Sequence, residues 1–301
     1  CGMGLLQSSQ GSGPLVAVPV MLLIIAPFGG GRTGLRAALW IPGIAGGLLI
    51  LLLAKLFYNE PAQIGVRPFG APEDEPIQEV QIGDVAKMRT KVFLYQAQRT
   101  SAFWNLIGIH FWGCAGHSVI LVYLVAMAED EGVPKGLAAG AFVMMSLTST
   151  ITRFAVPVIA ERMGSKPAMA GCFFLQVAPI VLLFFAQEAW QFYLFAILFG
   201  LGFGGVMSDF PIINRQYYGS GPIGTTYGYQ MMGAGVGMAF GALLGGGLRD
   251  WTGNFDATMA LSLLLSINGV ISILILPSTK RELLPNWEDL LPGSGQITHQ
   301  H

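Results

Sequence analysis

An arginine inside an apolar segment carries the strongest chemical implication in this sequence. Arg153 lies about two to three turns inside a segment of membrane length, about residues 136–158. A charged residue at the centre of a membrane helix costs roughly 2.5–3.5 kcal/mol on insertion scales, and arginine keeps its proton in proteins. Ser146, Ser149 and Thr150 share its helical face, because residues three and four apart are neighbours on a helix. We therefore expect Arg153 to face a cavity and to bind an anion.

Two other roles remain open for Arg153. Its long side chain could extend to the nearer membrane surface and keep its apolar stem in the hydrocarbon. It could also pair with a carboxylate elsewhere in the protein. The charged residues Glu161, Arg162 and Lys166 follow the segment and mark its end at the water phase.

Two histidines share one face of another apolar segment. His110, Cys114 and His117 are spaced i, i+4 and i+7 on the predicted helix. Histidine can accept a proton near physiological pH, so His110 and His117 are candidates for proton coupling. The alternative is that both are structural and hydrogen-bonded. No further cysteine, histidine or acid clusters beside them, so we expect no metal site.

Asp209 is a further candidate for proton coupling or gating. It follows the glycine run Gly200–Gly205 near the predicted inner end of its segment. The alternative is a structural pair with Arg215 or Arg162. The run matches the dinucleotide pattern G-x-G-x-x-G, but no strand precedes it, so we interpret its glycines as packing and bending points.

A stripe of glycines at a strict four-residue period marks the seventh apolar segment. Its members are Gly233, Gly237, Gly241 and Gly245. Small residues let a second helix approach closely, so we expect this stripe to pack against a helix. Tyr227 and Gln230 precede the stripe and could reach a cavity. They join Arg153, His117 and Ser149 as candidate substrate-binding residues.

The composition places these residues in a membrane protein. Of the 301 residues, 53% are hydrophobic and only 11% are charged, against about 25% charged in soluble domains. Recurring apolar runs of about 20 residues predict an all-α polytopic helix bundle in the lipid bilayer. Eight segments have membrane length: about 3–27, 37–57, 103–127, 136–158, 168–186, 190–210, 225–247 and 257–276. The net charge of −1 excludes nucleic acid as a partner.

The chain shows no sign of an enzyme. It has no P-loop, no Ser/His/Asp arrangement and no paired catalytic carboxylates, so we expect neither catalysis nor a cofactor. Two helix bundles with a cavity between them are instead the architecture of many transporters. A membrane-embedded enzyme and a non-transporting receptor are the remaining classes, and neither has a positive signal in the sequence.

One long polar region, about 58–101, divides the segments into two and six. Its prolines and charges predict a loop, with a surface helix from about Ile82. We therefore expect residues 1–57 to be the last two helices of an incomplete N-terminal half and 58–101 to be a cytoplasmic central loop. Residues 102–277 would form a six-helix half, and 278–301 a cytoplasmic tail. Because apolar sequence starts at once after Cys1, we expect N-terminal helices of the same chain to be missing.

Basic residues orient the predicted helices. With the long loop inside, most lysines and arginines of the connections are cytoplasmic, whereas the acidic run Glu129–Glu131 and Asp250 lie outside. Both ends of the chain are then cytoplasmic. We expect the protein in the cytoplasmic (plasma) membrane.

Several short motifs resemble those of the major facilitator superfamily. Glu161, Arg162, Gly164 and Lys166 resemble its loop motif Gly-x-x-x-Asp-Arg-x-Gly-Arg-Lys, with Pro157, Glu161 and Ser165 in place of Gly, Asp and Arg. Weaker matches occur elsewhere in the chain. Gly11–Pro14 resembles the motif of the fifth helix, and Gly30–Arg32 resembles the turn after it. Asn59–Gly70 resembles the entry of the central loop, Phe103–Trp104 the start of the next helix, and Leu248–Gly253 an outer turn. In order and spacing they cover nearly the whole chain. The eight segments would then be helices five to twelve.

Within the superfamily the chain is most similar to the monocarboxylate transporter and oxalate:formate antiporter branch. That branch has an arginine in the eighth helix that holds a substrate carboxylate, and Arg153 matches it by position. The antiporter's lysine in helix eleven has no counterpart in 225–247. The resemblance implies a secondary active transporter of a small organic anion, with a proton as the second partner and the loop motif as a gating element.

The alternative is a multidrug or other solute efflux transporter of the same superfamily. Such a protein would have an aromatic and methionine-rich cavity. Met144, Met145, Met231 and Met232 favour this alternative.

Overall fold

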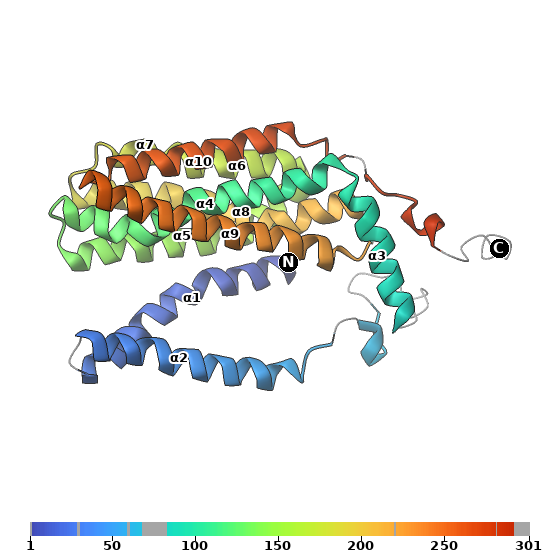
Figure 1. Ribbon diagram of the computed structural model, residues 1–301, viewed down its shortest axis with the longest axis horizontal. Helices are drawn as coiled ribbons and strands as arrows, with labels where there is room; N and C mark the ends of the chain where they lie inside the picture. Colours follow the sequence, from blue (N-terminus) through green and yellow to red (C-terminus); the bar gives the residue numbers. More distant parts are fainter. Residues whose placement is uncertain are drawn as a thin grey trace. The chain divides into compact units, whose positions relative to one another are not determined.

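The structure is a computed structural model that describes residues 2–28, 31–58, 61–67, 83–219, 221–280 and 282–291. Within these residues every regular element is a helix. Eight helical spans are long and apolar enough to cross a membrane (Figure 1). The predicted all-α polytopic fold is therefore confirmed. Gly30, both ends of the Asn59–Gly70 motif (59–60 and 68–70) and the end of the tail lie outside the described residues.

The membrane spans overlap the apolar segments that the sequence marks, and several of them, though not all, are longer. They are α1 (Gly2–Ile25) with η1 (Ala26–Phe28), α2 (Gly31–Ala54), α4 (Ser101–Asp130), α5 (Lys135–Met163), α6 (Ser165–Val177) with α7 (Ile180–Leu183), α8 (Ala189–Tyr218), α9 (Ile223–Thr252) and α10 (Asp256–Ile275). Outside the spans lie η2 (Pro61–Ile64), α3 (Asp84–Gln98) and η3 (Trp287–Leu290). A helix continues through charged residues at the membrane surface, so hydropathy marks only its middle.

The segment predicted at 168–186 is interrupted. Its first helix, α6, ends at Val177, and Pro179 precedes the single turn of α7. Proline has no backbone N–H to donate and its ring collides with the preceding turn, so it ends or kinks a helix. The two pieces together still have the length and apolarity of one membrane span.

The chain divides into two compact units. One consists of residues 16–88 and the other of residues 1–15 together with 89–301. In the smaller unit, Gly34 of α2 lies against Ile25 at the end of α1. Most apolar side chains of α2 are exposed, among them Leu49 and Leu51. This is the surface expected of a helix whose neighbours are lipid or other membrane helices.

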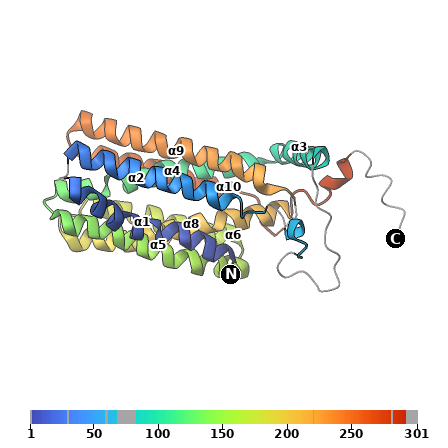
Figure 2. The same cartoon turned by 90° about the horizontal axis from the view of Figure 1, so that it is seen from below.

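The larger unit is a bundle in which α4 to α10 run side by side (Figures 1 and 2). Its most extensive contacts join α4 to α9 and α5 to α8. A methyl group on Gly237 or Gly241 of α9 would overlap backbone atoms of α4, and one on Gly204 of α8 would overlap Ser149 of α5. The lack of a side chain at these positions lets both helix pairs approach closely.

A helix from the central loop packs on one end of this bundle. Helix α3 begins at Asp84, where the sequence predicts a surface helix from about Ile82. Its Phe93 is fully buried and contacts the rings of Tyr218 and Trp287. This end of the larger unit is thus closed by aromatic side chains from α3, α8 and η3.

Candidate functional site

Arg153 lies in α5 with only 4% of its surface exposed. Its Nη1 donates to the backbone oxygen of Gln7 at 3.0 Å and to the Gln7 side-chain oxygen at 3.5 Å, while its Nε donates to Ser149 Oγ at 3.4 Å. Its Cζ lies 5.6 Å from the centre of the Phe203 ring. These contacts come from neutral groups of α1, α5 and α8.

The close approach of α1 to Arg153 depends on Gly11. A Cβ atom at this position would lie 2.9 Å from both Cδ and Nε of Arg153 and 3.1 Å from Thr150 Oγ1. Ser8 also donates from its hydroxyl to the Thr150 backbone oxygen at 3.4 Å. The start of α1 therefore covers the polar face of α5 with glycine and short polar side chains.

The hydroxyl groups on that face bond mainly to their own helix. Ser146 Oγ donates to the Phe142 oxygen at 3.1 Å, and Thr150 Oγ1 donates to the Ser146 oxygen at 2.9 Å. Ser149 Oγ differs, because its partner is a side chain of that helix and not a backbone oxygen: it accepts from Arg153 Nε. Ser149 is thus the member of the stripe that orients the guanidinium.

His117 and His110 are both buried on α4, with 2% and 3% of their surfaces exposed. Within the described residues, the Nδ1 atom of each has no hydrogen-bond partner. A small enclosed cavity adjoins them, lined by Gly113 and Cys114 of α4, Phe173 of α6 and Phe210 of α8, among others. Both histidines therefore line a space between three helices that is too small for a water molecule.

Phe203 connects the arginine with one of these histidines. Its ring centre lies 4.9 Å from that of His117 and 5.6 Å from Arg153 Cζ. Helices α4, α5 and α8 thus converge at this ring. Phe203 was not among the residues singled out from the sequence, although it lies within the run Gly200–Gly205 and is its one aromatic residue.

The second histidine belongs to a different contact. His110 stacks on Phe210 with ring centres 3.3 Å apart, and the Tyr227 ring of α9 lies edge-on at 6.0 Å. The structure therefore brings Tyr227 to His110 and not to Arg153. The candidates separate into one group around Arg153, Ser149 and His117 and another around His110 and Tyr227.

Gln230 faces a partner helix and not a cavity. It is fully buried, and its amide exchanges two hydrogen bonds with Asn214 of α8, of 2.9 and 2.8 Å. Because both ends of the Gln230 amide are occupied, a role in binding substrate requires this pair to open. Asn214 is another residue that the sequence did not point to.

Asp209 pairs with neither arginine proposed for it. It is fully buried, and within the described residues both of its carboxylate oxygens lack a hydrogen-bond partner. Its side chain lies beside Ser165 and the Met169 backbone of α6, while Arg215 donates to the Gly219 and Gly221 carbonyls. The alternative of a structural pair with Arg215 or Arg162 is therefore wrong, and Asp209 stays a candidate proton or gating carboxylate.

The loop motif joins α5, α6 and α10 at one end of the bundle. Glu161 and Arg162 are exposed, and Gly164 ends α5 with a φ of +89°. Lys166 Nζ donates to the backbone oxygens of Leu274 and Leu276 at 3.1 and 2.6 Å. A cation that bonds the last carbonyls of a helix stabilises that helix end. Lys166 thus caps α10.

Comparisons with known proteins agree with this architecture. The family model described as Major Facilitator Superfamily matches residues 2–217 and, in a second placement, 106–293. Among solved structures, the chain is similar to a crystal structure of the Major Facilitator Superfamily transporter FucP in the outward conformation, at 16% identity and a TM-score of 0.63, covering 92% of this chain and 68% of that chain. It is also similar to a variant of the E. coli fucose:proton symporter FucP, at 16% identity and a TM-score of 0.62, covering 91% and 68%. No curated protein sequence matches this chain.

Proposed function

The chain belongs to the Major Facilitator Superfamily, and we propose that it is a secondary transporter that moves a small, monocarboxylate-like organic anion together with a proton. The observation that carries this proposal is the buried guanidinium of Arg153 in the middle of a membrane span. Such a charge is costly in a bilayer, and ionisable residues at that depth are functional sites by default.

A carboxylate fits the donors of Arg153 better than its present acceptors do. In this conformation Nη1 bonds to the neutral backbone oxygen of Gln7. A carboxylate would accept two parallel hydrogen bonds from the guanidinium, and such charge-assisted bonds are about twice as strong as neutral ones. We propose that the anion displaces Gln7 and that Ser149 keeps the guanidinium oriented toward it.

His117 is the candidate that carries the proton. It contacts the same Phe203 ring as Arg153, and its Nδ1 has no hydrogen-bond partner within the described residues. An anion bound at Arg153 offsets the positive charge that opposes protonation of His117. A proton taken up with the anion also removes the cost of moving a net charge, about 2.3 kcal/mol per 100 mV. A relative of the same fold is named a fucose:proton symporter, which supports the proton as coupling ion.

The distribution of basic residues supports the orientation expected from the sequence. Helix α3 carries Lys87, Arg89 and Lys91, and the α5–α6 turn carries Arg162 and Lys166. In the proposed orientation these residues and both ends of the chain are cytoplasmic, in the cytoplasmic membrane.

Uptake of labelled lactate or pyruvate into proteoliposomes tests the site. We expect Arg153→Ala and Arg153→Lys both to abolish uptake, because a lysine ammonium cannot form the paired bonds of a guanidinium. Arg215→Lys is the matched control, since Arg215 bonds to backbone oxygens at the end of α8. Normal uptake by Arg153→Ala would show that the site is wrongly assigned.

Competition with lipophilic cations separates this proposal from drug efflux. The methionines that favour efflux do not converge: Met145 is 1% exposed in the core, whereas Met232 is 62% exposed on α9. Inhibition by a lipophilic cation, with no inhibition by pyruvate or lactate, would favour the efflux alternative.

A further inference from the structure

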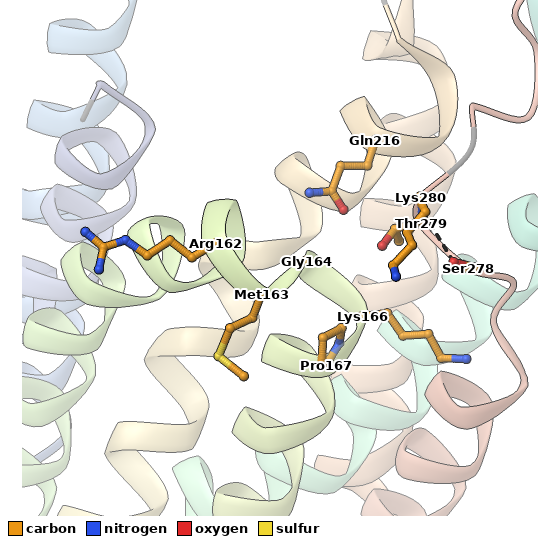
Figure 3. Close-up of a pocket in the computed structure, with 9 residues that line it drawn as sticks. All are labelled: Arg162, Met163, Gly164, Lys166, Pro167, Gln216, Ser278, Thr279 and Lys280. Atoms are coloured by element: carbon orange, nitrogen blue, oxygen red, sulfur yellow. Dashed lines mark hydrogen bonds between the residues drawn. The ribbon is translucent and has the colours of Figure 1, made fainter.

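A basic pocket opens where three membrane helices end. It has a volume of about 520 Å³ and nine lining residues: Arg162, Met163, Gly164, Lys166, Pro167, Gln216, Ser278, Thr279 and Lys280 (Figure 3). Three of the nine are cationic and none is acidic. The pocket thus favours a negatively charged ligand. Its Arg162 lies two and a half helical turns along α5 from Arg153, about 14 Å at a rise of 1.5 Å per residue.

The pocket lies at the level of the membrane surface. Helix α5 ends at Met163, α6 begins at Ser165 and α10 ends at Ile275, and all three are membrane spans. The pocket lies between the α5–α6 turn and the residues that follow α10. A ligand there would hold its polar group at the boundary between hydrocarbon and water.

The polar walls come from separate elements. The Nζ of Lys166 donates to the backbone oxygens of Leu274 and Leu276, which fixes its charge at the end of α10. An ammonium has three N–H donors, so a third can bond to a ligand. Figure 3 shows Gln216 and Lys280 extending toward the α5–α6 turn, whereas Arg162 points away from it. Lys280 therefore supplies the more adaptable cation, and Lys166 a fixed one.

An apolar surface continues from the pocket into the membrane. Helices α6 and α10 pack against each other. Their outer faces expose Phe174 by 65%, Leu274 by 63% and Ile275 by 70%. A free phosphate ion would use only the basic part of this surface, whereas a phospholipid would use both parts.

We propose that this pocket binds the phosphate headgroup of an anionic phospholipid, with its acyl chains along α6 and α10. Basic pockets between membrane helices are sites for anionic lipid headgroups. Because Lys166 also caps α10 and Gln216 accepts from the Ser165 N–H at 3.3 Å, a bound headgroup would tie α5, α6, α8 and α10 together at this end. The proposal does not depend on which solute is transported.

Native mass spectrometry of the purified protein tests the lipid. The protein is incubated with phosphatidylglycerol or phosphatidylcholine in matched detergent, with and without inorganic phosphate. We expect phosphatidylglycerol to be retained in preference to phosphatidylcholine. We also expect Lys280→Gln to weaken the retention of phosphatidylglycerol about fivefold, which is the usual contribution of one basic residue to the binding of an anionic lipid. Lys135→Gln is the control, because Lys135 begins α5 at the opposite end of the same helix and should leave retention unchanged.

Other outcomes would overturn the proposal. Equal retention of the two lipids, or equal loss in Lys280→Gln and Lys135→Gln, would show that the pocket does not select an anionic headgroup. Binding of inorganic phosphate that removes the lipid preference would assign the pocket to a soluble anion.

Discussion

The side-chain amides of Asn214 and Gln230 bond to each other in both directions, from α8 to α9. The Asn214 Nδ2 to Gln230 Oε1 distance is 2.9 Å and the return bond from Gln230 Nε2 is 2.8 Å. Both side chains are fully buried. The contact between α8 and α9 is otherwise small compared with that between α5 and α8. This amide pair is therefore a specific tie between two helices, and its opening would let them separate.

Replacing one amide of this pair should cost more than replacing both. Gln230→Leu or Asn214→Leu leaves a buried amide unpaired, which costs about 1–3 kcal/mol, whereas the double variant removes both polar groups. We expect each single variant to lose more stability than the double variant does. Thermal unfolding in detergent, analysed as a double-mutant cycle, measures these losses. Asn268→Leu is the control, because Asn268 is exposed and bonds only within α10. Additive losses would mean that the pair does not couple the helices.

The sequence predicts the spans well and their ends poorly. Apolar runs of membrane length predict each helix, because in lipid a single segment can satisfy all of its backbone hydrogen bonds only as a helix. The ends are set instead by glycines with positive φ, such as Gly164 at +89° and Gly253 at +78°, which follow the charged last turns of α5 and α9. A count of apolar residues stops several residues before them.

The depth of Arg153 can be predicted from one helix, but its partners cannot. Gln7 lies 146 residues away in the chain and Phe203 on a third helix. Which residues meet depends on the rotation and register of helices that pack through glycines, and the sequence alone does not specify these. The same reason explains why Gln230 was expected at a cavity when it in fact bonds to Asn214.

A methyl group at Gly11 should impair transport, whereas one at Gly13 should not. The Gly11→Ala side chain would lie 2.9 Å from Arg153 Cδ, but at Gly13 nothing lies within 4 Å. Both substitutions favour the helix by about 0.8–1.0 kcal/mol in intrinsic propensity, so the pair isolates the contact with Arg153. We expect Gly11→Ala to weaken substrate binding severalfold, measured as the KM of uptake. Equal KM values for the two variants would contradict the contact.

The proton role of His117 predicts a loss of pH dependence. Uptake coupled to a proton rises as the external pH falls through the range in which histidine titrates. His117→Gln keeps a polar group of similar size but cannot carry a proton, so we expect a flat profile between about pH 5.5 and 7.5. Exchange of labelled for unlabelled substrate moves no net proton and should persist in the variant. An unchanged pH profile would remove His117 from the coupling mechanism.

The tail of the chain should hold α3 against the bundle through Trp287. This indole is 4% exposed, lies 5.1 Å from the Phe93 ring and receives the Arg89 guanidinium over its face at 5.0 Å. Arg89 also pairs with Glu288, and the Leu283 N–H donates to the Tyr217 oxygen at 2.7 Å. Removing a buried tryptophan costs about 3–5 kcal/mol in a packed core, so Trp287→Ala should release α3.

Limited trypsin digestion measures this release at Lys91, within α3. We expect Trp287→Ala to speed cleavage there by at least tenfold, because each 1.4 kcal/mol that favours opening raises the open population tenfold. Arg89→Gln should have a much smaller effect, since its ion pair with Glu288 is partly exposed and such pairs contribute about 0–1 kcal/mol. If Arg89→Gln released α3 as fully as Trp287→Ala does, the charge pair and not the aromatic contact would hold the helix in place.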